Sequence, residues 1–353
     1  MSYAIAEPQP GPIADSTGDR RLLTVEDLEI VFDTTDGVVR AVNQVSFTID
    51  RGDVFAVVGE SGSGKSVTAL SILGLLPKPP AEVVGGRIMW QGENLLEATP
   101  ERMRHVRGGE IAMIFQDPLT ALNPVHSVGR QIAEMVRIHR GMKAKAAMAH
   151  AVAMLDLVGI PQADRRARMY PHEFSGGMRQ RAMIAMAIAC RPSLLIADEP
   201  TTALDVTVQA QVLDVLIGIK DEIDSAIMLI THDLGVVAGM ADNVMVMYAG
   251  RGVEEGSVDE VFDDSSHPYT IGLMDSVPTV EGEDAPLRPI GGQPPSMINL
   301  PSGCSFHPRC RFVHPDGPCA TEVPALLQIG DTSHRSACHY SSEVAEIRQE
   351  ERS

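Results

Sequence analysis

The stretch GESGSGKS, residues Gly59 to Ser66, decides the fold. It follows the short apolar run DVFAVV and precedes VTALSILGLL, whose apolar residues recur at helical spacing. The order of strand, glycine-rich loop and helix is the context in which the pattern G-x-x-x-x-G-K-S binds phosphate. The glycines let backbone N–H groups approach an anion, and the N-terminus of the helix adds partial positive charge. A plain glycine turn is the alternative, and the flanking elements argue against it.

Each residue of this loop is assigned to nucleotide binding. Lys65 is expected to reach the β- and γ-phosphates, and the Ser66 hydroxyl is expected to ligate Mg²⁺. The expected contacts are Gly59, Glu60, Ser61, Gly62, Ser63, Gly64, Lys65 and Ser66.

The neighbouring segments predict a doubly wound α/β core. The runs SLLIAD, AIMLIT and NVMVMY are short and apolar, as in buried parallel strands. They alternate with helical segments, of which MRQRAMIAMAIAC is apolar on nearly all sides and should be buried. Near the N-terminus, RLLTVEDLEIVF and VRAVNQVSFTI alternate apolar and polar residues, which indicates half-exposed antiparallel strands.

Two adjacent carboxylates follow one of these strands. SLLIADEP places Asp198 and Glu199 at the end of a buried run, where two charges repel unless each has its own role. Asp198 can hold Mg²⁺ through water, and Glu199 can activate an attacking water. A solvated acidic loop is the alternative. Together with the glycine loop, the pair predicts a P-loop NTPase.

HEFSGGMRQR, residues 172–181, provides a second glycine-rich helix start. Ser175, Gly176 and Gly177 can offer a hydroxyl and an N–H group to an anion. One chain cannot easily fold both anion sites onto one phosphate, whereas two chains packed head to tail can. The alternative is a plain N-cap, in which Ser175 satisfies its own helix.

Composition narrows the partners of the chain. The 353 residues carry a formal charge of -18, and aromatic residues make up 4%. An acidic chain with few stacking side chains disfavours nucleic-acid binding. The sequence has no apolar run of about 18 residues and no apolar segment behind a basic start. We therefore expect a chain that stays in the cytosol, where thiols are kept reduced.

In the order of these motifs the chain resembles the ATP-binding subunits of ABC transporters. Gln116 in MIFQDP matches the Q-loop, TALD (Thr202 to Asp205) matches the D-loop, and His232 in THD matches the switch histidine. The resemblance implies that Gln116 links Mg²⁺ to the membrane subunits and that His232 contacts the γ-phosphate. Phe32 falls where the family stacks an aromatic ring on adenine, and it can equally be a core residue. The signature departs from the family at Met178, where glutamine is usual.

The expected fold is an ABC ATPase core with an antiparallel β subdomain and a helical subdomain. Residues 1–20 are expected to be a disordered tail and 21–264 the nucleotide-binding domain, with its helical subdomain over about 117–178. Residues 265–342 are expected to form a small irregular extension that a bound metal holds together, and residues 343–353 are expected to be a charged tail.

The extension resembles that of oligopeptide/dipeptide permease ATPases, through HPYT (His267 to Thr270) and PSGCSFHPRC (residues 301–310). This resemblance implies a peripheral ATPase on the cytoplasmic face of the membrane that powers peptide import. Its implied partners are a paralogous ATPase, two membrane permease subunits and an extracytoplasmic peptide-binding protein. Related members move nickel, so nickel or another small solute is an alternative cargo. A soluble ABC ATPase of DNA repair or translation is a remote alternative.

Four of the five cysteines crowd into this extension: Cys304, Cys310, Cys319 and Cys338. Four thiolates suit Zn²⁺ or an iron–sulfur cluster, and the family resemblance implies a [4Fe-4S] cluster. Zinc, free thiols and disulfides stay open, and nearby histidines are alternative zinc ligands: His307, His314, His334 and His339. A metal would help to hold a segment with little helical pattern. Cys190 is expected to be a small apolar residue in a buried helix.

Overall fold

A computed structural model describes residues 20–202, 206–276 and 289–352. Nearly all of the expected N-terminal tail lies outside these residues. The strands are β1 Arg21–Thr34, β2 Gly37–Asp50, β3 Val54–Val58, β4 Ala81–Trp90, β5 Glu93–Asn94, β6 Ile111–Ile114, β7 Leu194–Asp198, β8 Ala226–Ile230, β9 Asn243–Tyr248, β10 Arg251–Ser257, β11 Leu327–Gln328 and β12 Arg335–Ser336. The α-helices are α1 Lys65–Ile72, α2 Pro100–His105, α3 Pro118–Ala121, α4 Val128–Arg140, α5 Ala144–Leu157, α6 Ala163–Arg166, α7 Gly176–Ile188, α8 Val206–Ile223, α9 Leu234–Met240, α10 Val258–Asp263, α11 Pro268–Met274 and α12 Ser341–Arg352. Short helical turns are η1 Leu95–Glu97, η2 Val106–Glu110, η3 Pro171–Glu173, η4 His307–Arg309 and η5 Pro318–Ala320.

The strands form two sheets. The larger has the order β11-β12-β10-β9-β3-β8-β7-β6, and the smaller has the order β2-β1-β4-β5. In the larger sheet β9, β3, β8, β7 and β6 run parallel, and the three strands at one edge are antiparallel. Every residue of β3, β7 and β8 is buried, which explains why these strands are continuous apolar runs. The predicted α/β core and the antiparallel β sheet are confirmed.

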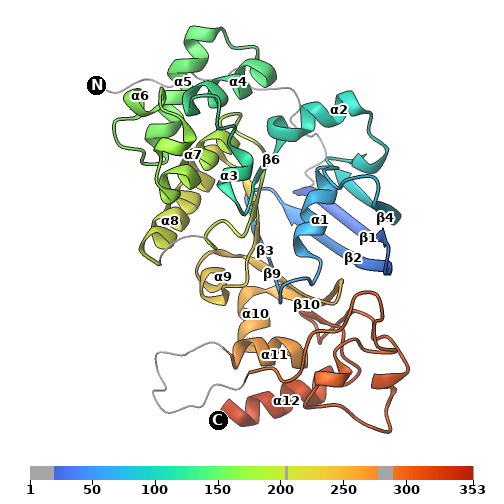
Figure 1. Cartoon of the computed structure of the whole chain (residues 1–353). Coiled ribbons are helices and arrows are strands. Elements are labelled where there is room, and N and C mark those ends of the chain that lie inside the picture. The colour runs from blue at the N-terminus through green and yellow to red at the C-terminus, as the bar shows by residue number, and fades with distance from the viewer. Residues whose placement is uncertain (1–19, 203–205, 277–288, 353) are drawn as a thin grey trace.

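Three apolar clusters surround the larger sheet. One joins the sheet to α4, α5, α7 and α8, which form the helical part seen at the upper left of Figure 1. A second joins the other face of the sheet to β1, β2, β4 and α1. The third lies toward the C-terminal extension and includes Tyr248, Tyr269 and Phe306. The side chains of β3 alternate between clusters, with Phe55 and Val57 in the second and Ala56 and Val58 in the third.

The C-terminal extension is more regular than expected. It contains α11, α12, β11 and β12, and its two strands continue the larger sheet beyond β10. The sheet therefore runs across the boundary expected near Ser265, a residue that is itself buried. Most of the expected charged tail over residues 343–353 lies in the helix α12, Ser341–Arg352. The Val344 side chain of this helix is buried, and Arg348 forms an ion pair with Asp275 at 2.8 Å.

The metal-stapled form of this extension is not supported. In residues 20–202, 206–276 and 289–352, no group of three or more histidine, cysteine or acidic side chains is arranged to hold a metal ion. The extension is instead attached by a buried ion pair, an aromatic cluster and strand pairing.

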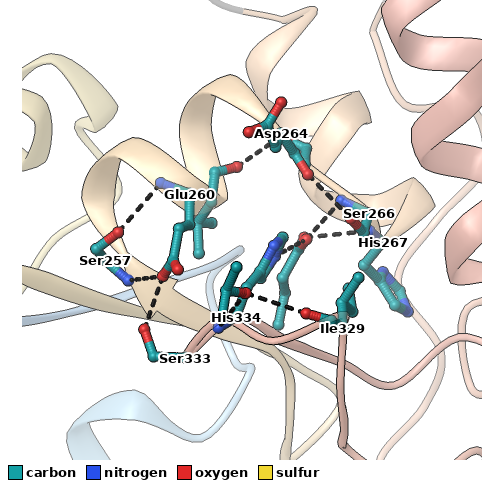
Figure 2. Close-up of polar contacts among 12 residues, drawn as sticks. Ser257, Glu260, Asp264, Ser266, His267, Ile329, Ser333 and His334 are labelled. Carbon is teal, nitrogen blue, oxygen red and sulfur yellow. Dashed lines mark hydrogen bonds and ion pairs between the residues drawn. The ribbon is translucent and has the colours of Figure 1, made fainter.

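The buried ion pair lies between β10 and β12. The Glu254 carboxylate is fully buried and lies 2.8 Å from His334 Nε2. It also accepts hydrogen bonds from the backbone N–H groups of Ser266, at 2.5 Å, and His267, at 3.2 Å. Figure 2 shows His334, Ser266 and His267 meeting at this point, with the cap of α10 formed by Ser257 and Glu260 beside them. A buried carboxylate is tolerated only when such donors surround it.

His267 also begins α11, because its Nδ1 accepts the Tyr269 N–H at 3.1 Å. Complete burial lowers the pKa of His267 to about 3, although a hydrogen bond with the Ala337 backbone opposes this shift. The folded chain therefore holds this imidazole neutral down to low pH.

His267→Asn should reduce the acid sensitivity of the fold, while the amide oxygen keeps the helix cap. The unfolded histidine titrates near pH 6.5, so below this pH only the unfolded chain takes up the proton. The stability that neutral His267 provides is complete above pH 6.5 and is lost as the pH falls towards 3. Urea unfolding at pH 7 and 5 should show that the wild type loses about 2 kcal/mol more than the variant. The exposed-site control His172→Asn should behave as the wild type; equal losses in wild type and His267→Asn would contradict the prediction.

Candidate functional site

The phosphate-type loop lies between β3 and α1, as predicted, and its glycines have identifiable roles. Gly59 and Gly64 have φ angles of +147° and +105°. A Cβ atom on Gly59 would lie 2.2 Å from the Met247 carbonyl oxygen, and one on Gly64 would lie 2.4 Å from that of Ala41. The loop therefore packs directly against the backbone of β9 and β2, which only glycine permits at these two positions.

Lys65 folds back into this loop. Its Nζ donates hydrogen bonds to the carbonyl oxygens of Gly59, at 2.8 Å, and Glu60, at 2.9 Å. Burial lowers the pKa of the ammonium group, and the nearby carboxylates Glu199, Asp198 and Glu60 raise it. The Lys65 ammonium group lies in the centre of the loop, where it can recognise an anionic phosphate.

Asp198 and Ser66 lie together, as expected of two residues that share a metal ion. The Ser66 hydroxyl donates to Asp198 Oδ1 at 2.9 Å. Burial raises the pKa of Asp198, the Ser66 hydrogen bond lowers it, and the charge of Glu199 raises it further. A bound divalent cation would offset the charge repulsion between Asp198 and Glu199. Hydroxyl and carboxylate oxygens are also ligands that Mg²⁺ prefers.

Glu199 joins the remaining predicted catalytic residues. Its Oε2 accepts hydrogen bonds from Gln116 Nε2, at 3.0 Å, and from the Thr202 hydroxyl, at 2.8 Å. His232 Nδ1 lies 3.7 Å from Glu199 Oε1. Glu199 has a left-handed φ of 46°, and its N–H donates to the Ile230 carbonyl oxygen at 2.8 Å. Such a backbone conformation is costly for a non-glycine residue and is typical of functional sites.

Comparison with known proteins agrees with this geometry. Residues 42–202 match the family model for ABC transporters, and residues 253–319 match the model for the C-terminal region of oligopeptide/dipeptide transporters. A probable peptide ABC transporter ATP-binding protein of Sinorhizobium fredii, y4tR, is 53% identical over 92% of the chain and 97% of its own length. The oligopeptide transport ATP-binding protein OppD of Haemophilus influenzae is 53% identical over 82% of the chain and 90% of its own length. The dipeptide transport ATP-binding protein DppD of Bacillus subtilis is 51% identical over 82% of the chain and 87% of its own length.

The chain belongs to the ABC transporter ATP-binding subunits of the oligopeptide/dipeptide type. Solved structures agree with this ABC ATPase fold. A dimeric ATP-binding cassette bound to ADP and phosphate superposes with a TM-score of 0.61 at 22% identity, covering 67% of the chain and 99% of that chain. CbiO1 of Clostridium perfringens, part of the transporter complex CbiONQ, superposes at 0.59 with 27% identity, covering 70% of the chain and 92% of that chain.

The signature segment of this ABC ATPase lies at the start of α7. Ser175 and Gly176 are exposed, and the Ser175 hydroxyl accepts the Met178 N–H at 3.4 Å, as in a plain N-cap. A contribution of Ser175 and Gly177 to the nucleotide of a second chain stays a prediction. The Met178 side chain packs against the helical core, and its sulfur lies 3.1 Å from Arg166 Nη1.

Other predicted residues fall outside the cluster around Lys65 and Glu199. Phe32 lies on β1, half-buried against the apolar cluster of the smaller sheet. Cys190 is buried just beyond α7. Of the D-loop residues 202–205, only Thr202 lies within the described part of the chain. None of the described helices is long and apolar enough to span a membrane.

Three contacts at this ABC ATPase site were not predicted from the sequence. The Thr202 hydroxyl supports Glu199 directly. Arg309 pairs with the Glu60 carboxylate, and the Tyr269 hydroxyl accepts the Glu60 N–H. Both residues stood in motifs of the extension, HPYT and PSGCSFHPRC, but nothing in the sequence indicated that these motifs reach the phosphate loop.

Gly64→Ala should destabilise the fold more than Gly62→Ala. Both residues have positive φ angles, so both substitutions incur a backbone cost of about 1 kcal/mol. Only at Gly64 does the new Cβ meet backbone, whereas nothing lies within 4 Å of a Cβ on Gly62. Urea unfolding should show Gly64→Ala to be about 2 kcal/mol less stable than Gly62→Ala. Equal losses would mean that the close approach to Ala41 has no energetic consequence.

Proposed function

We propose that this ABC ATPase powers the import of di- and oligopeptides through a membrane permease. The observation that carries the peptide assignment is the match of residues 253–319 to the C-terminal region of oligopeptide/dipeptide transporters. Relatives named for peptide, oligopeptide and dipeptide transport support it, at 51% to 53% identity. Nickel and other small solutes have no comparable support, and the acidic chain disfavours the DNA-repair alternative.

The chemistry follows from the contacts of the loop and of Glu199. Lys65 stabilises charge on the β- and γ-phosphates, together with the backbone N–H groups at the start of α1. Glu199 orients and deprotonates the attacking water, and Gln116, Thr202 and His232 hold its carboxylate in place. Ser66, Asp198 and Gln116 are the residues that would hold Mg²⁺, which neutralises phosphate charge when bound.

Transport requires partners beyond this chain. Exposed Ser175 and Gly176 support a head-to-tail dimer in which each chain completes the nucleotide site of the other. The second chain is a paralogous ATPase, and the dimer sits on two permease subunits at the cytoplasmic face of the membrane. An extracytoplasmic peptide-binding protein delivers the cargo. Closure of the dimer on ATP and its reopening after hydrolysis move the permease between its two open states.

Glu199→Gln should stop ATP turnover while leaving ATP binding intact. The amide keeps the size of the side chain but cannot accept the proton of water, so kcat should fall by about 100-fold or more. Steady-state phosphate release in the assembled transporter, with the partner ATPase disabled, measures this effect. The control Lys65→Ala should lose nucleotide binding itself. Wild-type hydrolysis by Glu199→Gln would remove Glu199 from the catalytic role.

We also propose that the four cysteines of the extension bind a [4Fe-4S] cluster, with zinc as the alternative. The support is their chemistry and their proximity. Burial, together with the neighbouring cysteine thiolates, raises the pKa of Cys310 to about 11 and that of Cys338 to about 12. The Cys304 N–H donates to the Cys319 carbonyl oxygen at 2.9 Å, so these two residues are neighbours in space, although the cysteines do not form a ligand group among the described residues. Metal binding would require them to lose their protons.

Anaerobic purification followed by assays of iron, acid-labile sulfide and zinc tests this proposal. A cluster predicts about four iron and four sulfide per chain. Cys338→Ser should lose iron, while Cys190→Ala, outside the group, should keep it. About one zinc without sulfide would replace the cluster by zinc, and an absence of both metals would overturn the proposal.

A further inference from the structure

One contact of the C-terminal extension with the phosphate loop is the ion pair between Arg309 and Glu60. Arg309 Nη1 lies 2.7 Å from Glu60 Oε2, and Arg309 Nη2 lies 3.0 Å from Glu60 Oε1. The two residues are 249 positions apart in the chain. Glu60 is the second residue of the loop GESGSGKS, and Arg309 belongs to η4, between Cys304 and Cys310. A bidentate ion pair of this kind fixes the relative orientation of the guanidinium and carboxylate groups as well as the distance between them.

The guanidinium of Arg309 is held rigidly in this position. Its side chain is only 5% exposed, and its Nε donates to the Gly291 carbonyl oxygen at 2.9 Å. Nη1 also lies 3.3 Å from the Tyr248 hydroxyl. The guanidinium carbon lies 5.8 Å from the centre of the Tyr248 ring and 5.9 Å from that of Phe306, within the range of cation–π attraction. Little rotational freedom is left for Arg309 to lose when it pairs with Glu60.

The extension also holds the backbone of Glu60. The Glu60 N–H donates to the Tyr269 hydroxyl at 2.8 Å, and Tyr269 is fully buried in α11. The carbonyl oxygen of the same residue accepts the hydrogen bond from Lys65 Nζ at 2.9 Å. Side chain and N–H of Glu60 are thus fixed by the extension, and its carbonyl fixes the lysine of the loop.

From this chain of contacts we propose that Arg309 is a positioning residue for the nucleotide site. Through Glu60 it sets the conformation of the phosphate loop, so that the affinity for MgATP depends on the seating of the Cys304–Cys310 segment. This inference rests on the nucleotide site proposed above. It adds a role in ATP binding to an extension that holds Glu60 through Arg309 and Tyr269 and that also contacts the core away from the loop.

Those other contacts provide the matched control. Arg335 of β12 pairs with Glu255 of β10 at 2.6 Å, which is again an arginine of the extension on a carboxylate of the core. This pair does not involve the phosphate loop. Its loss should loosen the extension without altering Lys65, whereas loss of the Arg309 pair should alter both.

The experiment compares Arg309→Gln, Arg309→Lys, Glu60→Gln and Arg335→Gln in the full-length chain. Affinity for MgATP is measured with a fluorescent ATP analogue, KM and kcat by phosphate release in the assembled transporter, and thermal stability by circular dichroism. Arg309→Gln and Glu60→Gln should each weaken MgATP binding and raise KM by roughly tenfold with a smaller change in kcat. The double variant should be no weaker than either single one, because both remove the same contact. Arg309→Lys, which keeps the charge but not the fork, should lie between the wild type and Arg309→Gln.

Arg335→Gln should lower the melting temperature and leave MgATP affinity unchanged. Wild-type affinity in Glu60→Gln would overturn the inference, and so would an equal loss of affinity in Arg335→Gln. Because Glu60 lies on the core loop, Glu60→Gln provides this test even if the Arg309 variants fold poorly. Lys65→Ala tests the nucleotide site independently of the role of Arg309. Loss of MgATP binding in Lys65→Ala with normal binding in Glu60→Gln refutes only the role of Arg309. Normal binding in Lys65→Ala would refute the nucleotide site itself.

Discussion

The parallel pairing of β6, β7, β8 and β3 is the constraint on which the site depends. Parallel strands end at the same edge of a sheet, so the residues that follow them are brought together whatever their separation in the chain. Gln116 follows β6, Asp198 ends β7 and Glu199 follows it. His232 follows β8, and the loop with Lys65 follows β3. The contacts of Glu199 and the Ser66–Asp198 hydrogen bond are the direct result. The apolar runs that build the sheet therefore also determine the chemistry at its edge.

This constraint explains why the core and its site could be predicted from the sequence. The strand β3, the loop Gly59–Ser66 and α1 are consecutive, so their local pattern carries both fold and function. Ser175 shows the limit within the core. A single chain satisfies its hydroxyl with its own helix, and any contribution to another nucleotide depends on a surface that a second chain must supply.

The extension was predicted less well, because its order comes from contacts between distant residues. Glu254 and His334 are 80 positions apart, and neither residue has a neighbour in sequence that marks it as half of a buried pair. The helix α12 has few apolar residues, and contacts of Glu343, Val344 and Arg348 with distant parts of the chain hold it in place. The four cysteines predict metal binding, whereas the described contacts that hold the extension are an ion pair, aromatic rings and two short strands.

The pairing of β12 with β10 has a consequence for solubility. Without β11 and β12, strand β10 would be the outermost strand of the larger sheet, with a row of free N–H and C=O groups. An uncovered edge of this kind is a template on which strands of other molecules can add, and natural proteins shield such edges. The two-residue strand β12 is short, but Ala337, directly after β12, also donates its N–H to the Val253 carbonyl oxygen of β10 at 2.8 Å. The extension thus covers an edge of the sheet at which strands of other molecules could otherwise pair.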